Sequence, residues 1–271
     1  MARILSRLSG IPYFLTAHLG DVPGGVPEKT DRWFRYIYPF THAIWKDAAK
    51  VVAVSDYTRA LALKHYNVAI EVIPNGVKLP REFKDKDAIQ VGEPPRIIFA
   101  GRFQPQKNLP FLIETLAKVK DLAWDCVLMG DGPQREPIEN AIRENQLEER
   151  IHLPGWVHTE TVWQELGRSD LLAMPSLSEG LPVVGVHALG QGLAIVANRA
   201  GGLSDLVDDR VNGCLCDVGD ETCFEGALRW CLEDSERLKT MKQASLQMAK
   251  YFDIERVADS YERLFKERLS G

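Results

Sequence analysis

The sequence contains 271 residues, of which 45% are hydrophobic and 26% charged, and its formal net charge at pH 7 is -5. This composition is typical of a globular chain with enough apolar residues for a sizeable core, in one large domain or two smaller ones. The acidic balance argues against a sequence-independent nucleic-acid binder, which normally has a basic face, so no nucleic-acid partner is expected.

Short apolar runs rich in β-branched residues recur along most of the chain, and segments with helical periodicity separate them. This alternation predicts a parallel α/β fold, in which the loops at the carboxyl ends of the strands bind ligands. Strands are expected at residues 13–17, 50–55, 70–74, 96–101, 125–130, 150–155, 170–175 and 193–198. Helices are expected at residues 108–120 and 135–150, from about residue 181, and at residues 251–269.

These elements divide the chain into two lobes. Residues 1–79 contain only about three expected strands, fewer than a doubly wound domain normally has. Residues 80–95 are charged and then rich in Pro and Gly, which predicts a linker. Residues 96–250 contain the remaining alternations and form the second lobe, and residues 251–271 are expected to form a helix that returns to the first lobe.

The sequence predicts neither a signal peptide nor a membrane helix. Gly10 and Pro12 interrupt the apolar run at the beginning of the chain, which therefore lacks a continuous hydrophobic region. The uncharged residues 180–198 contain Pro, Gln and repeated Gly, which disfavour a membrane-spanning helix.

The five cysteines, Cys126, Cys214, Cys216, Cys223 and Cys231, are unevenly spaced. Their number is odd, and their spacing matches neither a disulfide framework nor a repeated CxxC metal motif. Buried, reduced thiols in a reducing cytoplasm are therefore expected. The alternative, in which Cys214 and Cys216 form one edge of a metal site, lacks a second pair of ligands.

A pair of cations follows the strand expected at residues 96–101. Arg102 and Lys107 lie in a loop between that strand and a helix that begins near Asn108. Two cations beside the unsatisfied N–H groups of a helix N-terminus suit a phosphate or diphosphate. The alternative is a solvated loop with two ordinary surface charges.

Three other strand ends carry polar residues. Asp131 lies between two glycines after residues 125–130, where it is either a ligand contact or a turn residue. Glu179 follows residues 170–175, where it is either a helix cap or an acceptor for ligand hydroxyls. His18 and Asp21 follow the first strand, and His18 is either structural or directed into the cleft between the lobes.

Seven stretches, in order, resemble motifs of the family 4 retaining glycosyltransferases. They are VAVSDYTR, VIPNGV, FAGRFQPQKN, MGDGP, LPGWV, PSLSEGLPVVGVHALGQGLAIVAN and AGGLSDLV. The resemblance implies the GT-B fold, with two Rossmann-like parallel-sheet lobes, of which the N-terminal one is incomplete here. It also implies a retaining enzyme that moves a sugar from a nucleotide-sugar donor to a hydroxyl of a glycan, glycolipid or small acceptor, with no metal or other cofactor.

The resemblance also assigns roles to individual residues. Arg102 and Lys107 match the family's diphosphate-binding cations, which stabilise the growing charge of the leaving group. Glu179 matches a carboxylate that contacts the transferred sugar, and His18 matches a cleft histidine near the sugar or the acceptor. The backbone amides of Gly180 and Leu181 are candidates to hold phosphate oxygens. The remaining donor-side candidates are Val157 and His187 at the ribose and base, and Gly101, Gly130 and Asp131.

His187 departs from the family pattern, because it stands where family members carry a second glutamate that accepts hydrogen bonds from the ribose. A carboxylate accepts from two hydroxyls at once, whereas a neutral imidazole offers one acceptor and one donor. Weaker donor binding or a different donor preference is therefore expected.

Two alternatives to the transferase remain open from the sequence. They are a truncated or degenerate module that binds nucleotide sugar without turnover, and a GT-B-like nucleotide-sugar epimerase. The expected location is the cytoplasm, with peripheral association at the inner face of the membrane as a further possibility.

Overall fold

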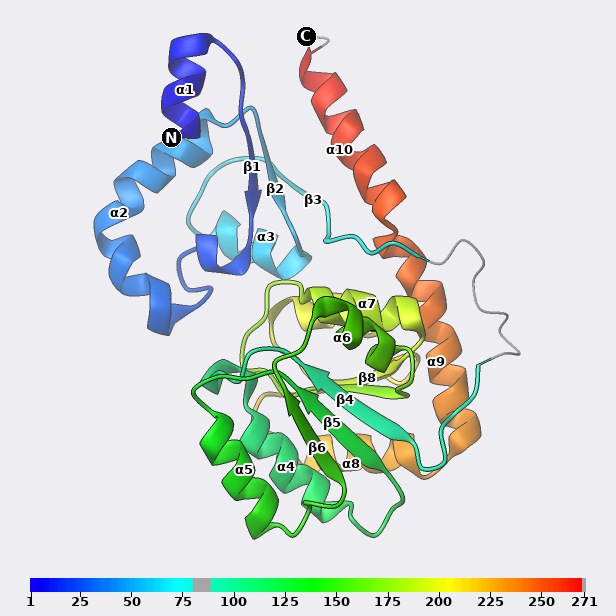
Figure 1. The fold of residues 1–271 in the computed structure, drawn as a ribbon. Helices are drawn as coiled ribbons and strands as arrows, with labels where there is room; N and C mark the ends of the chain where they lie inside the picture. Colours follow the sequence, from blue (N-terminus) through cyan, green and yellow to red (C-terminus); the bar gives the residue numbers. More distant parts are fainter. Residues whose placement is uncertain (80–88, 270–271) are drawn as a thin grey trace.

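The computed structural model describes residues 1–79 and 89–269, with the side chains of 27–31 and 268–269 left out. Most of the expected linker, residues 80–88, lies outside the described residues. Within the described ranges the chain forms two parallel β-sheets with helices packed around them (Figure 1).

The first sheet contains three strands in the order β1-β2-β3, all parallel. Its strands are β1 (Phe14–Ala17), β2 (Lys50–Ala53) and β3 (Ile70–Val72), and its helices are α1 (Ala2–Ser9), η1 (Leu19–Asp21), α2 (Pro27–Asp47) and α3 (Asp56–Leu63). The side chain of Ser55 caps α3 by accepting a hydrogen bond from the Thr58 amide at 3.0 Å, which fixes where β2 ends and the helix begins.

The second sheet contains six parallel strands in the order β6-β5-β4-β7-β8-β9. Its strands are β4 (Arg96–Ala100), β5 (Asp125–Met129), β6 (Ile151–Gly155), β7 (Leu171–Met174), β8 (Ala194–Asn198) and β9 (Gly213–Cys216). The chain runs outward from β4 in one direction and then returns to β7 on the other side of β4. This reversal creates a crevice at the carboxyl ends of the strands, where open α/β sheets bind ligands.

Helices cover both faces of this sheet (Figure 1). They are η3 (Pro105–Lys107), α4 (Leu109–Lys118), α5 (Arg135–Glu144), α6 (Thr159–Leu166), α7 (Val183–Gln191), η4 (Gly201–Asp205), α8 (Glu221–Leu232) and α9 (Ser235–Ala249). Alternate residues of the strands point into two separate cores: Ile97 and Phe99 into one, Ile98 and Ala100 into the other. Burial on both faces explains why these strands are apolar throughout.

The last helix, α10 (Ile254–Leu269), lies against the first sheet, where the red helix of Figure 1 runs beside β3. Its Phe265 ring lies edge-on to Phe14 with centroids 4.6 Å apart, and its Arg263 forms an ion pair with Glu71 at 2.6 Å. Residues at the start of the chain and at its end therefore share one small core, which includes Val52 and Leu264.

The eight strands expected from the sequence are confirmed, each within two residues at either end. β9 was missed, because a four-residue strand containing Gly213 and two cysteines has little β-branched character. The helix expected at residues 108–120 is confirmed as α4, and its Leu109, Leu112 and Leu116 side chains are buried against the sheet.

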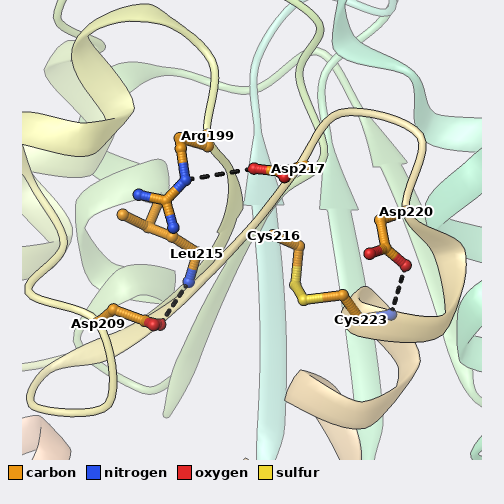
Figure 2. Close-up of a disulfide and its surroundings, with 7 residues drawn as sticks. All are labelled: Arg199, Asp209, Leu215, Cys216, Asp217, Asp220 and Cys223. Atoms are coloured by element: carbon orange, nitrogen blue, oxygen red, sulfur yellow. Dashed lines mark hydrogen bonds and ion pairs between the residues drawn. A yellow bond between two sulfur atoms is a disulfide. The ribbon is translucent and has the colours of Figure 1, made fainter.

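The expectation of reduced thiols is wrong for two of the five cysteines. Cys216 at the end of β9 forms a disulfide with Cys223 in the first turn of α8 (Figure 2). Asp220 caps the N-terminus of α8, because its side chain accepts a hydrogen bond from the Cys223 amide at 2.9 Å. This cap holds Cys223 in the first turn of the helix, next to Cys216. The spacing of the cysteines in the sequence did not reveal the turn between β9 and α8 that brings this pair together. Cys216 and Cys223 therefore no longer support the expectation of a reducing compartment. Cys126, Cys214 and Cys231 are free and buried, as expected.

Candidate active site

A cavity of about 380 Å³ opens at the carboxyl ends of β4 and β5. The loop after β4 contributes Gly101 and Arg102, and the end of β5 contributes Gly130. Val157, after β6, and His187, on α7, also line the cavity. The fold therefore brings five of the expected donor-side residues, far apart in sequence, around one space.

Gly130 allows the two strand ends to approach each other closely. Its φ is 143°, and a Cβ atom at this position would come closer than 3.0 Å to the backbone of Gly101. The neighbouring Asp131 does not line the cavity. Its carboxylate accepts a hydrogen bond from the Gly132 amide at 2.7 Å and lies 3.6 Å from Arg135. These contacts are those of a turn residue, one of the two alternatives that the sequence left open.

The walls of the cavity include two tryptophans that the sequence analysis did not identify as site residues. Trp156 follows β6, and Trp163 lies in α6. The Trp163 ring lies 4.6 Å from the His187 ring at an interplanar angle of 34°. In the sequence, Trp156 directly follows an expected strand, within the stretch LPGWV, whereas Trp163 carries no comparable signal.

His187 is half-buried between α7 and this aromatic wall. Burial lowers its pKa from the ordinary value of 6.5, because a charged imidazole loses solvation in this environment. The ring is therefore neutral at pH 7, with one nitrogen as acceptor and one N–H as donor.

The two expected diphosphate cations have different surroundings. Arg102 is exposed, and its guanidinium forms no ion pair within the described part of the chain. Lys107, at the end of η3, forms an ion pair with Glu179. The turn that carries Lys107 is also bonded to the loop of Glu179, since Leu177 donates to the Gln106 carbonyl at 2.8 Å.

Glu179 is buried, and it does not cap a helix. The expected helix start near residue 181 lies two residues too early, because α7 begins at Val183, after Pro182. Proline disfavours helical conformation in the residue before it, so Leu181 stays outside the helix. The side chain of Glu179 pairs with Lys107 rather than capping α7, and its backbone carbonyl accepts a hydrogen bond from the Gly202 amide at 3.0 Å.

The first lobe contacts this same loop. Ser178 donates to the Gly25 carbonyl at 3.1 Å, and Asn75 donates to the Leu181 carbonyl at 2.9 Å. A Cβ atom on Gly180 would lie 3.2 Å from the Cβ atom of Leu19. The sequence analysis did not identify Gly25, Asn75 or Leu19, because only the packing of the lobes makes them neighbours of the site.

His18 immediately precedes Leu19, so it lies next to the Glu179 loop but outside the cavity. Its backbone amide donates to the Asp21 carboxylate at 2.9 Å, which stabilises the turn η1 and positions the histidine at the end of β1. Its side chain is exposed at the junction of the lobes.

Residues 1–79 and 89–269 contain no group of three or more His, Cys, Asp or Glu side chains that could hold a metal ion. No helix in these ranges combines the length and apolarity needed to cross a membrane.

Comparison with known families identifies the chain. The family model described as "Glycosyl transferases group 1" matches residues 80–248, and that described as "Glycosyltransferase Family 4" matches residues 1–81. The chain belongs to the group 1 glycosyltransferases. It is therefore a transferase enzyme, and the family expected from the sequence is confirmed.

Curated relatives of this glycosyltransferase extend over most of its length. An uncharacterized glycosyltransferase of Methanocaldococcus jannaschii is 26% identical over 97% of this chain and 71% of the relative. The Escherichia coli UDP-Gal:alpha-D-GlcNAc-diphosphoundecaprenol alpha-1,3-galactosyltransferase is 26% identical over 98% of this chain and 72% of the relative. The GDP-mannose-dependent alpha-(1-6)-phosphatidylinositol monomannoside mannosyltransferase of Mycolicibacterium smegmatis is 27% identical over 76% of this chain and 59% of the relative.

Solved structures support the GT-B fold of this glycosyltransferase. Sucrose-phosphate synthase from Thermosynechococcus elongatus superposes with a TM-score of 0.82 at 20% identity, covering 99% of this chain and 70% of that protein. The Anabaena protein HepE in complex with UDP superposes with a TM-score of 0.82 at 22% identity, covering 97% of this chain and 74% of that protein. The expected α/β architecture is thus confirmed.

Proposed function

We propose that this glycosyltransferase takes its sugar from a nucleoside-diphosphate sugar and transfers it with retention of configuration. The observation that carries the proposal is Arg102, an exposed cation without an ion pair in the described residues, at the wall of an apolar cavity. A nucleoside in the cavity would direct its diphosphate toward Arg102 and toward Lys107 beyond it. UDP and GDP sugars both occur in the names of relatives.

The chemistry needs charge stabilisation at the leaving group. As the glycosidic bond breaks, negative charge grows on the nucleoside diphosphate, and Arg102 and Lys107 are cations fixed in position to stabilise it. The amides of Gly180 and Leu181 form no hydrogen bond within the described residues, so they are available to phosphate oxygens. Glu179 then positions the sugar through its hydroxyls, and the acceptor attacks from the leaving-group face.

His187 is proposed to contact the ribose. It lines the cavity together with Arg102, and its neutral ring accepts one hydrogen bond from a ribose hydroxyl. The ribose contact is therefore weaker than the two hydrogen bonds that a carboxylate would accept.

The acceptor is proposed to approach from the first lobe, past His18. The relatives' names include a phosphatidylinositol mannoside and a diphosphoundecaprenol-linked sugar as acceptors, alongside small molecules such as 2-deoxystreptamine. On α2, Trp33 and Phe40 are exposed, with fractions of 67% and 71%, and Arg32 and Arg35 are exposed beside them. Exposed aromatic rings flanked by arginines support a lipid-linked acceptor at an anionic membrane surface.

A donor panel tests the proposal. The protein is incubated with UDP-, GDP- and ADP-sugars, with and without acceptors, while nucleotide release and product anomers are measured. Acceptor-dependent release with a retained anomer supports the transferase. Donor binding without turnover would instead indicate a binding module, and interconversion of the donor an epimerase.

Matched arginine variants test the role of Arg102. Arg102→Met should weaken binding of the donor about tenfold or more, because a charge-assisted hydrogen bond contributes about 1.5–3 kcal/mol. Arg143→Met is the control, since Arg143 on α5 is exposed and does not line the cavity. Equal donor affinities of the two variants would remove Arg102 from the site.

Vesicle sedimentation tests the membrane part. The protein should sediment with vesicles that contain phosphatidylglycerol more strongly than with pure phosphatidylcholine. Replacing Arg32 and Arg35 together with glutamine should reduce this difference. Failure to sediment with either vesicle would exclude the membrane surface as the place of the acceptor.

A further inference from the structure

We propose that Glu179 competes with the donor diphosphate for Lys107, so that the site retains the sugar-bearing donor and releases the free nucleoside diphosphate. The inference rests on the proposed function, since it concerns the same site. It adds a role for Glu179 beyond the contact with the sugar. In the structure the carboxylate holds the cation that the diphosphate requires.

The ion pair is built into the structure. Only 20% of the Lys107 side chain and 9% of the Glu179 side chain are exposed. The two loops that carry these residues are also joined through Gln106, whose carbonyl accepts from the Leu177 amide at 2.8 Å and whose side chain donates to the Ser178 carbonyl. The pair therefore forms whenever these loops are in place, unlike an exposed ion pair between mobile side chains.

The charges around the site give an order of events. Arg102 is exposed and forms no ion pair within the described residues, so it is the cation that an arriving diphosphate meets first. Lys107 is neutralised by Glu179 until the diphosphate displaces the carboxylate. The lysine ammonium has three donors on a flexible stem, so it can turn from Glu179 to a phosphate oxygen without movement of the backbone.

Displacement leaves Glu179 as a buried carboxylate that needs new partners. A buried charge that loses its partner is strongly unfavourable, because it is neither solvated by water nor paired. Hydroxyls of the donor sugar compensate this cost by donating hydrogen bonds to the carboxylate. A free nucleoside diphosphate has no sugar to do so. After transfer, Glu179 therefore recovers Lys107, and the nucleoside diphosphate dissociates more readily.

The decisive experiment measures binding of free nucleoside diphosphates by isothermal titration calorimetry. UDP, GDP and ADP are titrated into the wild type, and the tightest of the three is then titrated into Glu179→Gln. We expect about tenfold tighter binding by the variant, which corresponds to about 1.4 kcal/mol, because Lys107 is no longer held by an anion. The variant should also lose the preference of the wild type for the sugar-bearing donor over the free diphosphate.

Glu139→Gln is the matched control. Glu139 lies on α5 in the same lobe and pairs with Arg135 at 2.8 Å, and neither residue lines the cavity. The same change of charge there should leave the affinity for the diphosphate unaltered. Equal tightening in both variants would mean that only the net charge matters and would overturn the proposal.

Lys107→Met separates competition for the lysine from simple repulsion by the carboxylate. In the Lys107→Met background, the Glu179→Gln substitution should no longer tighten binding, since there is no cation left to release. Tightening of the same size in that background would overturn the proposal in favour of direct repulsion.

Unaltered or weaker binding by Glu179→Gln alone would overturn the proposal as well. A misfolded variant does not bind more tightly, so the sign of the change separates the effect from damage to the fold. If neither the wild type nor Glu179→Gln binds any of the three diphosphates, the proposed donor class itself fails, and the competition fails with it.

Discussion

Replacing Gly202 with alanine should destabilise the loop that carries Glu179. A Cβ atom at this position would come closer than 3.0 Å to the backbone carbonyl of Gly180 and 3.1 Å from the Cβ atom of Ser55. The backbone at residues 179–180 must therefore move away, and the hydrogen bond from the Gly202 amide to the Glu179 carbonyl, 3.0 Å long, is lost with it.

The two contributions set the expected magnitude. Loss of the hydrogen bond costs about 1 kcal/mol, and overpacking in a tight site costs about 1–3 kcal/mol. Gly202→Ala should therefore lower the free energy of unfolding by about 2–4 kcal/mol. It should also weaken binding of the nucleoside diphosphate, because Gly180 and its amide shift.

Urea denaturation, followed by circular dichroism, measures the change in stability. Gly226→Ala is the matched control, since a Cβ atom on this exposed glycine of α8 meets nothing within 4 Å. In a helix interior that substitution should stabilise the protein by up to about 1 kcal/mol. A Gly202→Ala variant as stable as Gly226→Ala would refute the close packing of residues 179–180 against 201–202.

Three further predictions concern the proposed ribose contact and the core. His187→Glu should tighten donor binding, since a charge-assisted hydrogen bond contributes about 1.5–3 kcal/mol, and His187→Ala should weaken it. Equal dissociation constants for the donor in the wild type and both variants would remove His187 from the site. The folded protein holds the pKa of His187 below 6.5, so the neutral ring contributes stability above pH 6.5 that is lost as the pH falls below it. The free energy of unfolding of the wild type and of His187→Gln, measured at pH 7.5 and 5.5, tests this pH dependence. If both proteins lose the same stability between the two pH values, the prediction is contradicted. Lys242→Met should destabilise the second lobe by about 3–5 kcal/mol, because it leaves the buried carboxylate of Asp170 without its cation, whereas Lys239→Met on the same helix should have little effect on the urea midpoint.

The alternation of strands and helices was readable from the sequence because parallel strands in this fold are buried on both faces. Ile97 and Phe99 face one core and Ile98 the other, so the whole strand is apolar and short, with turn residues at its ends. β9 was not readable, since Gly213 and two cysteines carry no such signal, and it is a strand because it pairs with β8.

Some residues around the cavity were also predictable, because they follow strands of one sheet whose carboxyl ends share an edge. Arg102 and Gly130 needed only their positions after β4 and β5 to be expected at one crevice. Trp163 was not expected there, because its place opposite His187 depends on how α6 packs beside α7.

The sequence by itself determined the order of the elements and the kinds of charge at the strand ends, because these follow from local pattern and composition, and the resemblance of its ordered motifs indicated the family. The tertiary structure decided which charges meet. The Lys107–Glu179 pair joins residues from two loops, and the Cys216–Cys223 disulfide depends on the turn between β9 and α8. The contact of Gly25 with Ser178 depends on how the lobes pack. Such contacts arise only when the chain is folded, since no local preference of either partner specifies the other.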